Sequence, residues 1–132
     1  MYEGAPRANG RVAAIALVAV LLLVGSGCTW IARQSVNSAG EEAHGNSGQV
    51  TVSADGRYVA FASEAGDLVR ADTNGRRDIF VRDNSNNAVT RVSVATEGTE
   101  ADGNSSHPSI SDDGRYVAFE SEATNLAPTD TN

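Results

Sequence analysis

The segment SADGRYVAFAS at residues 53–63 returns as SDDGRYVAFES at residues 111–121, and this repetition decides the fold class. The similarity extends outward, so that residues 33–74 align without gaps on residues 91–132 at an offset of 58, with 24 of 42 positions identical. A fixed period of this size is typical of chains in which one small unit covers its apolar face by stacking on copies of itself. We therefore expect a repeat protein.

Short runs of alternating apolar and polar residues predict β-strands in each copy of the repeat. The strands expected in the first copy are residues 49–54, 58–63, 78–83 and 88–94. Asp55-Gly56 and the polar segment 84–87 are typical tight turns, so these strands form a four-stranded antiparallel meander. The second copy repeats the first half of this pattern with strands at 107–112 and 116–121. The fold class is all-β.

The repeated motif carries a family resemblance. The pattern S-x-D-G-R-Y-V-A-F-x-S at 53–63 and 111–121, followed by DTNGRRDIFVRD at 72–83, resembles the TolB-type, WD40-like β-propeller repeat of bacterial exported proteins. This resemblance implies a β-propeller of four-stranded antiparallel blades. Only about one and a half blades are present, whereas propellers carry about four to eight.

The resemblance also implies a division of the chain. Residues 33–48 are an outer closing strand with its loop, 49–94 are a complete blade, and 95–132 are a loop and the first half of the next blade. On this interpretation the chain is the N-terminal fragment of a longer product. The alternative is a short protein whose copies assemble into a ring to cover their strand edges.

The first 28 residues predict a secretory signal. Arg7 and Arg11 precede the apolar run 12–24, which is shorter than the ~20 residues of a membrane-spanning helix. The segment LVGSGC at 23–28 resembles a bacterial lipobox, which implies acylation of Cys28. An uncleaved signal anchor is the alternative. Both predict an exported chain, tethered to a membrane on the periplasmic or cell-surface side.

The charge of the chain excludes one class of partner. The formal net charge is −7, and all ten basic residues are arginines. Nucleic acids and anionic lipid surfaces bind clustered Lys and Arg. We therefore expect no nucleic-acid partner.

One loop has a spacing that is reminiscent of a metal site. Asp72, Asn74 and Asp78 place side-chain oxygens around a glycine, as calcium loops do. Arg76 and Arg77 oppose a cation there, and the alternative is an Asx turn that presents the third strand. Calcium is the only cofactor that the sequence suggests.

Three classes of function follow from these features. The first is a non-catalytic, membrane-tethered scaffold that binds another cell-envelope protein, as the resemblance to TolB-type propellers implies. The second is a propeller enzyme that acts on extracellular polysaccharide, and the third is a truncated product without a function of its own. No catalytic residue is predicted, because His107 is matched by Gln49 in the first copy.

Overall fold

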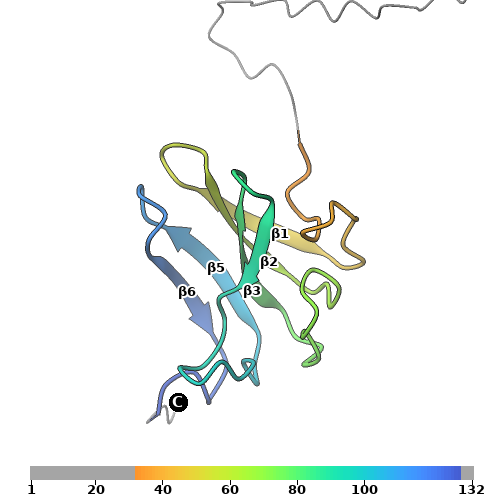
Figure 1. The fold of residues 1–132 in the computed structure, drawn as a ribbon. Coiled ribbons are helices and arrows are strands. Elements are labelled where there is room, and N and C mark those ends of the chain that lie inside the picture. The colour runs from red at the N-terminus through yellow and green to blue at the C-terminus, as the bar shows by residue number, and fades with distance from the viewer. Residues whose placement is uncertain (1–31, 129–132) are drawn as a thin grey trace, which may run out of the picture. The chain divides into compact units, whose positions relative to one another are not determined.

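The computed structural model describes residues 32–128, which form six β-strands and no helix (Figure 1). The predicted signal with Cys28, and the last four residues of the second copy, lie outside the described residues. Between residues 32 and 128 no helix is long and apolar enough to cross a membrane. The expected all-β fold is confirmed for this part of the chain.

The first sheet is an antiparallel meander with the strand order β1-β2-β3-β4, as predicted. Its strands are β1 (Ser47–Val52), β2 (Tyr58–Ser63), β3 (Asp78–Asp83) and β4 (Ala88–Arg91). β1 ends two residues earlier than expected, because Ser53 belongs to the turn: its hydroxyl accepts the Tyr58 N–H at 2.9 Å and donates to Asp55 at 2.6 Å. The Ser53 hydroxyl thus takes the place of a backbone carbonyl as the acceptor for the Tyr58 N–H.

The second sheet consists of β5 (Ser105–Ile110) and β6 (Val117–Ser121), paired antiparallel. Its turn repeats the first one, since Ser111 accepts the Tyr116 N–H and donates to Asp113. Gly114 has φ +71° in this turn, a conformation that glycine adopts without steric cost. The sequence repeat is therefore also a repeat of hydrogen bonds.

Each copy carries the same β-bulge near the start of its first strand. The register of β1 against β2 shifts between Gly48 and Thr51, and the register of β5 against β6 shifts between Ser106 and Ser109. The bulged residues Gln49 and His107 have the same positive φ of 51°. A bulge turns side chains out of the regular alternation, so these two equivalent residues point away from the pleat.

Two predicted strands are shorter or absent in the described structure. β4 stops at Arg91 instead of residue 94, because the chain turns there: the Val94 N–H donates to the Val92 carbonyl at 2.9 Å. Residues 33–36, expected as a closing strand, form the same tight turn and contribute one bridge between Val36 and Glu42. The equivalent bridge in the second copy joins Val94 and Glu100.

The apolar core lies on one face of the first sheet. Phe61 of β2 and Phe80 of β3 stack with ring centroids 5.9 Å apart. The loop after β2 closes over them with Ala65 and Leu68, both at most 2% exposed. The part of this face formed by β2 and β3 is therefore covered by the repeat's own loop.

The opposite face of the first sheet is covered by the second repeat. Ala60 and Ile79 are completely buried on this face, where β5 lies against β1, β2 and β3. Pro108 and Ile110 of β5 are buried in turn, whereas Ser109 between them is exposed. Figure 1 shows the two sheets facing each other. The two repeats thus share one interface.

Candidate functional site

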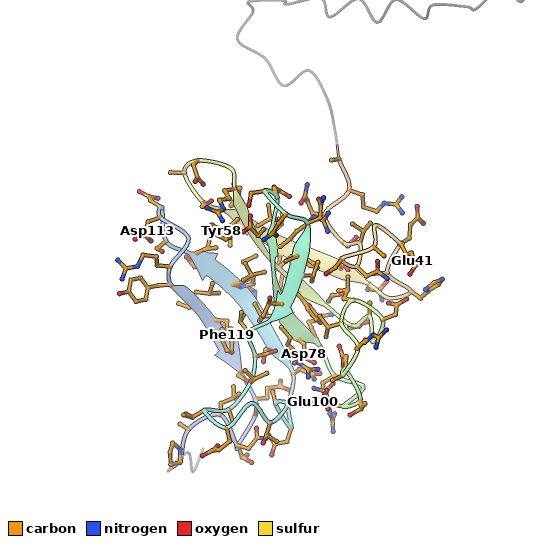
Figure 2. The ribbon with its side chains drawn as sticks, in the orientation of Figure 1. Glu41, Tyr58, Asp78, Glu100, Asp113 and Phe119 are labelled. Atoms are coloured by element: carbon orange, nitrogen blue, oxygen red, sulfur yellow. The ribbon has the colours of Figure 1, made fainter. Side chains whose placement is uncertain are left out.

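The predicted metal-ligating residues gather in a polar cluster around Arg91. The Arg91 Nη1 atom lies 3.3 Å from Asp72, 3.8 Å from Asp78 and 2.6 Å from Glu100. The side chains of Asp72 and Asp78 are at most 3% exposed, and that of Arg91 is 8% exposed. Figure 2 shows Asp78 and Glu100 at the same end of the molecule. A guanidinium is thus the cation among three carboxylates.

Asn74 and Ser93 each donate a hydrogen bond to Asp78. Asn74 accepts the Arg76 N–H at 2.8 Å, which is the Asx turn expected as the alternative to calcium, and its amide donates to Asp78. Ser93 donates to the other Asp78 oxygen at 2.6 Å and accepts the Ile79 N–H. The buried carboxylate of Asp78 therefore has hydrogen-bond partners on both oxygens, as a buried charge requires.

Glu100 belongs to the second repeat and joins it to this loop of the first. Its two oxygens accept the N–H and the hydroxyl of Thr73 at 2.8 and 2.7 Å, and these bonds lower the pKa of Glu100. Asp72 shifts in the opposite direction, because burial, together with the Asp78 carboxylate, raises its pKa. The cluster therefore contains carboxyl groups with pKa values displaced in both directions.

The sequence contains a signal for Arg91 and Glu100 in the repeat itself. Both residues recur in the repeat, as Arg33 and Glu42, and these also form an ion pair. The first pair is exposed at the surface, whereas Arg91 and Glu100 are enclosed by the loop that follows β2. The repeated charged pair therefore indicates an ion pair in each copy, and the loop after β2 makes the second pair part of the cluster.

The arrangement of donors opposes a calcium ion. Calcium takes six to eight oxygens, whereas here the Arg91 guanidinium lies between the two aspartates, and the Asn74 amide donates to Asp78 and to the Ala101 carbonyl. Within residues 32–128, no group of three or more His, Cys, Asp or Glu is placed to hold a metal ion. Calcium at Asp72, Asn74 and Asp78 stays a prediction from the sequence.

A polar cleft lies where the ends of the two sheets meet. Its volume is about 390 Å³. It is lined by Glu64, Arg77, Asn104, Ser106, Glu120, Ser121 and Glu122. Arg77 crosses it to pair with Glu64 at 2.6 Å, and its backbone joins the two sheets, since the Arg77 carbonyl accepts the Ser105 N–H at 2.7 Å. The lining is acidic overall and open to solvent.

His107 contacts its own counterpart in the first repeat. Gln49 accepts the His107 N–H at 3.0 Å, and the two side chains meet at 3.2 Å. The His107 ring also contacts Glu120 at 3.1 Å. The histidine thus takes part in the junction between repeats.

No family model, curated protein or solved structure matches the chain. The resemblance to the TolB-type propeller repeat therefore rests on the sequence motifs at 53–63, 72–83 and 111–121. The repeated turns, bulges and bridges of the structure are independent of that resemblance.

Replacement of Arg91 tests whether the guanidinium holds the cluster. Arg91→Leu leaves Asp72, Asp78 and Glu100 without their cation. We expect the free energy of unfolding, measured by urea denaturation, to fall by about 3–5 kcal/mol. Arg70→Leu, at an exposed position, is the matched control. Millimolar calcium is expected to leave the wild-type midpoint unchanged. A rise with calcium that Asp78→Asn abolishes would contradict this and would establish the metal site.

The acid stability of the chain follows from its hydrogen-bonded carboxylates. The pKa is lowered for Asp55, Glu64, Asp67, Asp83, Glu100, Asp102 and Asp113. The unfolded chain titrates at the ordinary values of 3.8 and 4.5, so this stability is complete above about pH 4.5 and is lost as the pH falls. The raised pKa of Asp72 acts in the opposite direction.

We therefore expect a lower urea midpoint at pH 3 than at pH 7. Asp83→Asn removes the pair with Arg57, the main cause of the lowered Asp83 pKa, and should reduce the difference between the two midpoints. Glu97→Gln, in an exposed loop, should leave the difference unchanged. Equal midpoints at both pH values would show that these carboxylates do not govern stability.

Proposed function

We propose that this chain is an exported, membrane-tethered repeat protein of the β-propeller type, which acts as a non-catalytic scaffold for another cell-envelope protein. The observation that carries the proposal is the contact between Gln49 and His107, which occupy equivalent positions 58 residues apart. Contacts between equivalent residues arise when whole repeats stack in register. Together with the sequence motif, this stacking supports blades repeated around an axis.

The surface that suits a protein partner is the polar cleft between the sheets. It is lined by Glu64, Glu120 and Glu122 from the ends of strands, with Arg77 as its basic residue. Polar, solvent-open surfaces of this kind bind partners through hydrogen bonds and charge complementarity, which set specificity and encounter rate. The acidic lining selects a partner that presents basic or amide groups.

The tether is proposed at Cys28, on the lipobox-like sequence alone. A lipid chain at this position places the first β-strand about twenty residues from the membrane surface, since β1 starts at Ser47. Stable anchoring by acylation takes more than one lipid chain or a second signal. A scaffold held in this way meets only partners of the same envelope compartment.

Cross-linking in the native host tests the proposal. A photo-reactive amino acid at Glu122, in the cleft, is expected to cross-link one discrete envelope protein, and the same group at Ser85, in the exposed turn after β3, is expected not to. Glu64→Lys should abolish the cross-link by reversing a charge of the cleft.

The tether and the enzymatic alternative are tested on the same cells. Cys28→Ser is expected to release the chain from the membrane fraction, with Ser35→Ala as the control. Identical cross-links from Glu122 and Ser85 would contradict a specific scaffold. Turnover of extracellular polysaccharide by the purified chain would contradict a non-catalytic role.

A further inference from the structure

Two apolar residues at one end of the repeat stack are exposed although their counterparts are buried. Val50 and Val52 of β1 are 66% and 54% exposed. At an offset of 58 they correspond to Pro108, which is buried, and Ile110, which is 9% exposed. The difference has one cause: β5 has the first sheet beside it, whereas β1 has no sheet on that side within residues 32–128.

The opposite end of the stack shows the complementary difference. Tyr58 packs so closely over the turn of the second repeat that a Cβ added to Gly114 would lie 2.1 Å from its ring. Its counterpart Tyr116 is 67% exposed. The counterpart of Gly114 is Gly56, and a Cβ added there would meet no atom within 4 Å. Tyr58 and Gly114 therefore contact each other, whereas Tyr116 and Gly56 each lack the equivalent contact.

The small residues of the strands follow the same rule. Ala60 of β2 is completely buried against the second sheet. Its counterpart in β6, Ala118, is exposed. We call the surface of Val50, Val52 and Gly56 the head surface, and the surface of Tyr116 and Ala118 the tail surface. The head surface repeats one side of the internal interface, and the tail surface repeats the other.

We propose that the head surface of one copy of this chain binds the tail surface of a second copy, with the geometry that already joins the two repeats. Tyr116 of one copy then covers Gly56 of the next, as Tyr58 covers Gly114. Val50 and Val52 then face Ala118, as Pro108 and Ile110 face the first sheet. The contact is heterologous, so successive copies form a closed ring or an open filament.

One residue of the tail side, Glu120, differs from its counterpart in the first repeat and predicts how a substitution changes the association. Glu120 of β6 stands where the first repeat has Ala62, which is 3% exposed. Burial of a carboxylate at the new interface opposes association. The ring of the exposed His107 lies 3.1 Å from Glu120. We expect Glu120→Ala to strengthen association.

Complementation between two blocked variants tests the head-to-tail geometry. In the full chain in detergent, the head-blocked variant carries Val50→Asp and Val52→Asp, and the tail-blocked variant carries Ala118→Asp. The wild type should associate with rising concentration in analytical ultracentrifugation, and each blocked variant alone should associate at least about tenfold more weakly. An equimolar mixture should form a heterodimer, because each variant keeps the surface that the other lacks.

Matched variants separate this interface from other causes of association. Thr96→Asp adds the same charge to an exposed loop and should associate like the wild type. Far-ultraviolet circular dichroism checks that the variants keep their β-structure. A wild type that stays monomeric would overturn the proposal. So would equal association of all variants, as through the apolar run 12–24, or a mixture that forms no heterodimer.

Discussion

The constraint on which this structure depends is that β2 and β3 are covered on both faces. One face carries Phe61 and Phe80 under the loop of the same repeat, and the other carries Ala60 and Ile79 under the next repeat. A strand that is apolar on both faces needs cover on each of them, and the loop of one repeat covers only one face. The second repeat therefore supplies the cover of one face, and the spacing of 58 residues places equivalent residues in register.

The polar cluster around Arg91 reinforces the same interface with charge. Arg91 and Glu100 of the second copy contact Asp72 and Thr73 of the first, so that a buried cation and its carboxylates join the two copies. A buried network of this kind costs desolvation and gives back specificity only when every member has a partner. The Nε and Nη1 atoms of Arg91 make no well-formed hydrogen bond, so the cluster adds ion pairs to an interface that also buries Ala60 and Ile79.

The strands and turns were predictable because their signals are local. Alternating residues and the Asp-Gly turns at 55–56 and 113–114 placed β1, β2, β3, β5 and β6 within about two residues, whereas β4 ends three residues early. The ends of β1 and β5 could not be predicted in this way, because Ser53 and Ser111 also fit a strand pattern. Only the hydrogen bonds of their hydroxyls place them in the turn.

The candidate site was predicted in part. Asp72, Asn74 and Asp78 do lie together, but their cation is Arg91, and the spacing within the loop carries no information about a side chain that the meander brings back from β4. The exposure of individual strand residues could not be predicted from the sequence either. Val50 and Val52 occupy the same positions of the repeat as Pro108 and Ile110. Their exposed fractions differ only because β1 and β5 lie at different positions in the stack.

Hydrogen exchange of the full chain, followed by mass spectrometry, tests the central claim that the second repeat holds the first. The variant Ile110→Asp introduces a charge where β5 meets the first sheet. We expect the amides of β2 and β3 to lose protection together with those of β5 and β6, because both sheets depend on one interface. Loss of protection confined to β5 and β6, with β2 and β3 unchanged, would contradict the claim and would mean that the first repeat folds by itself.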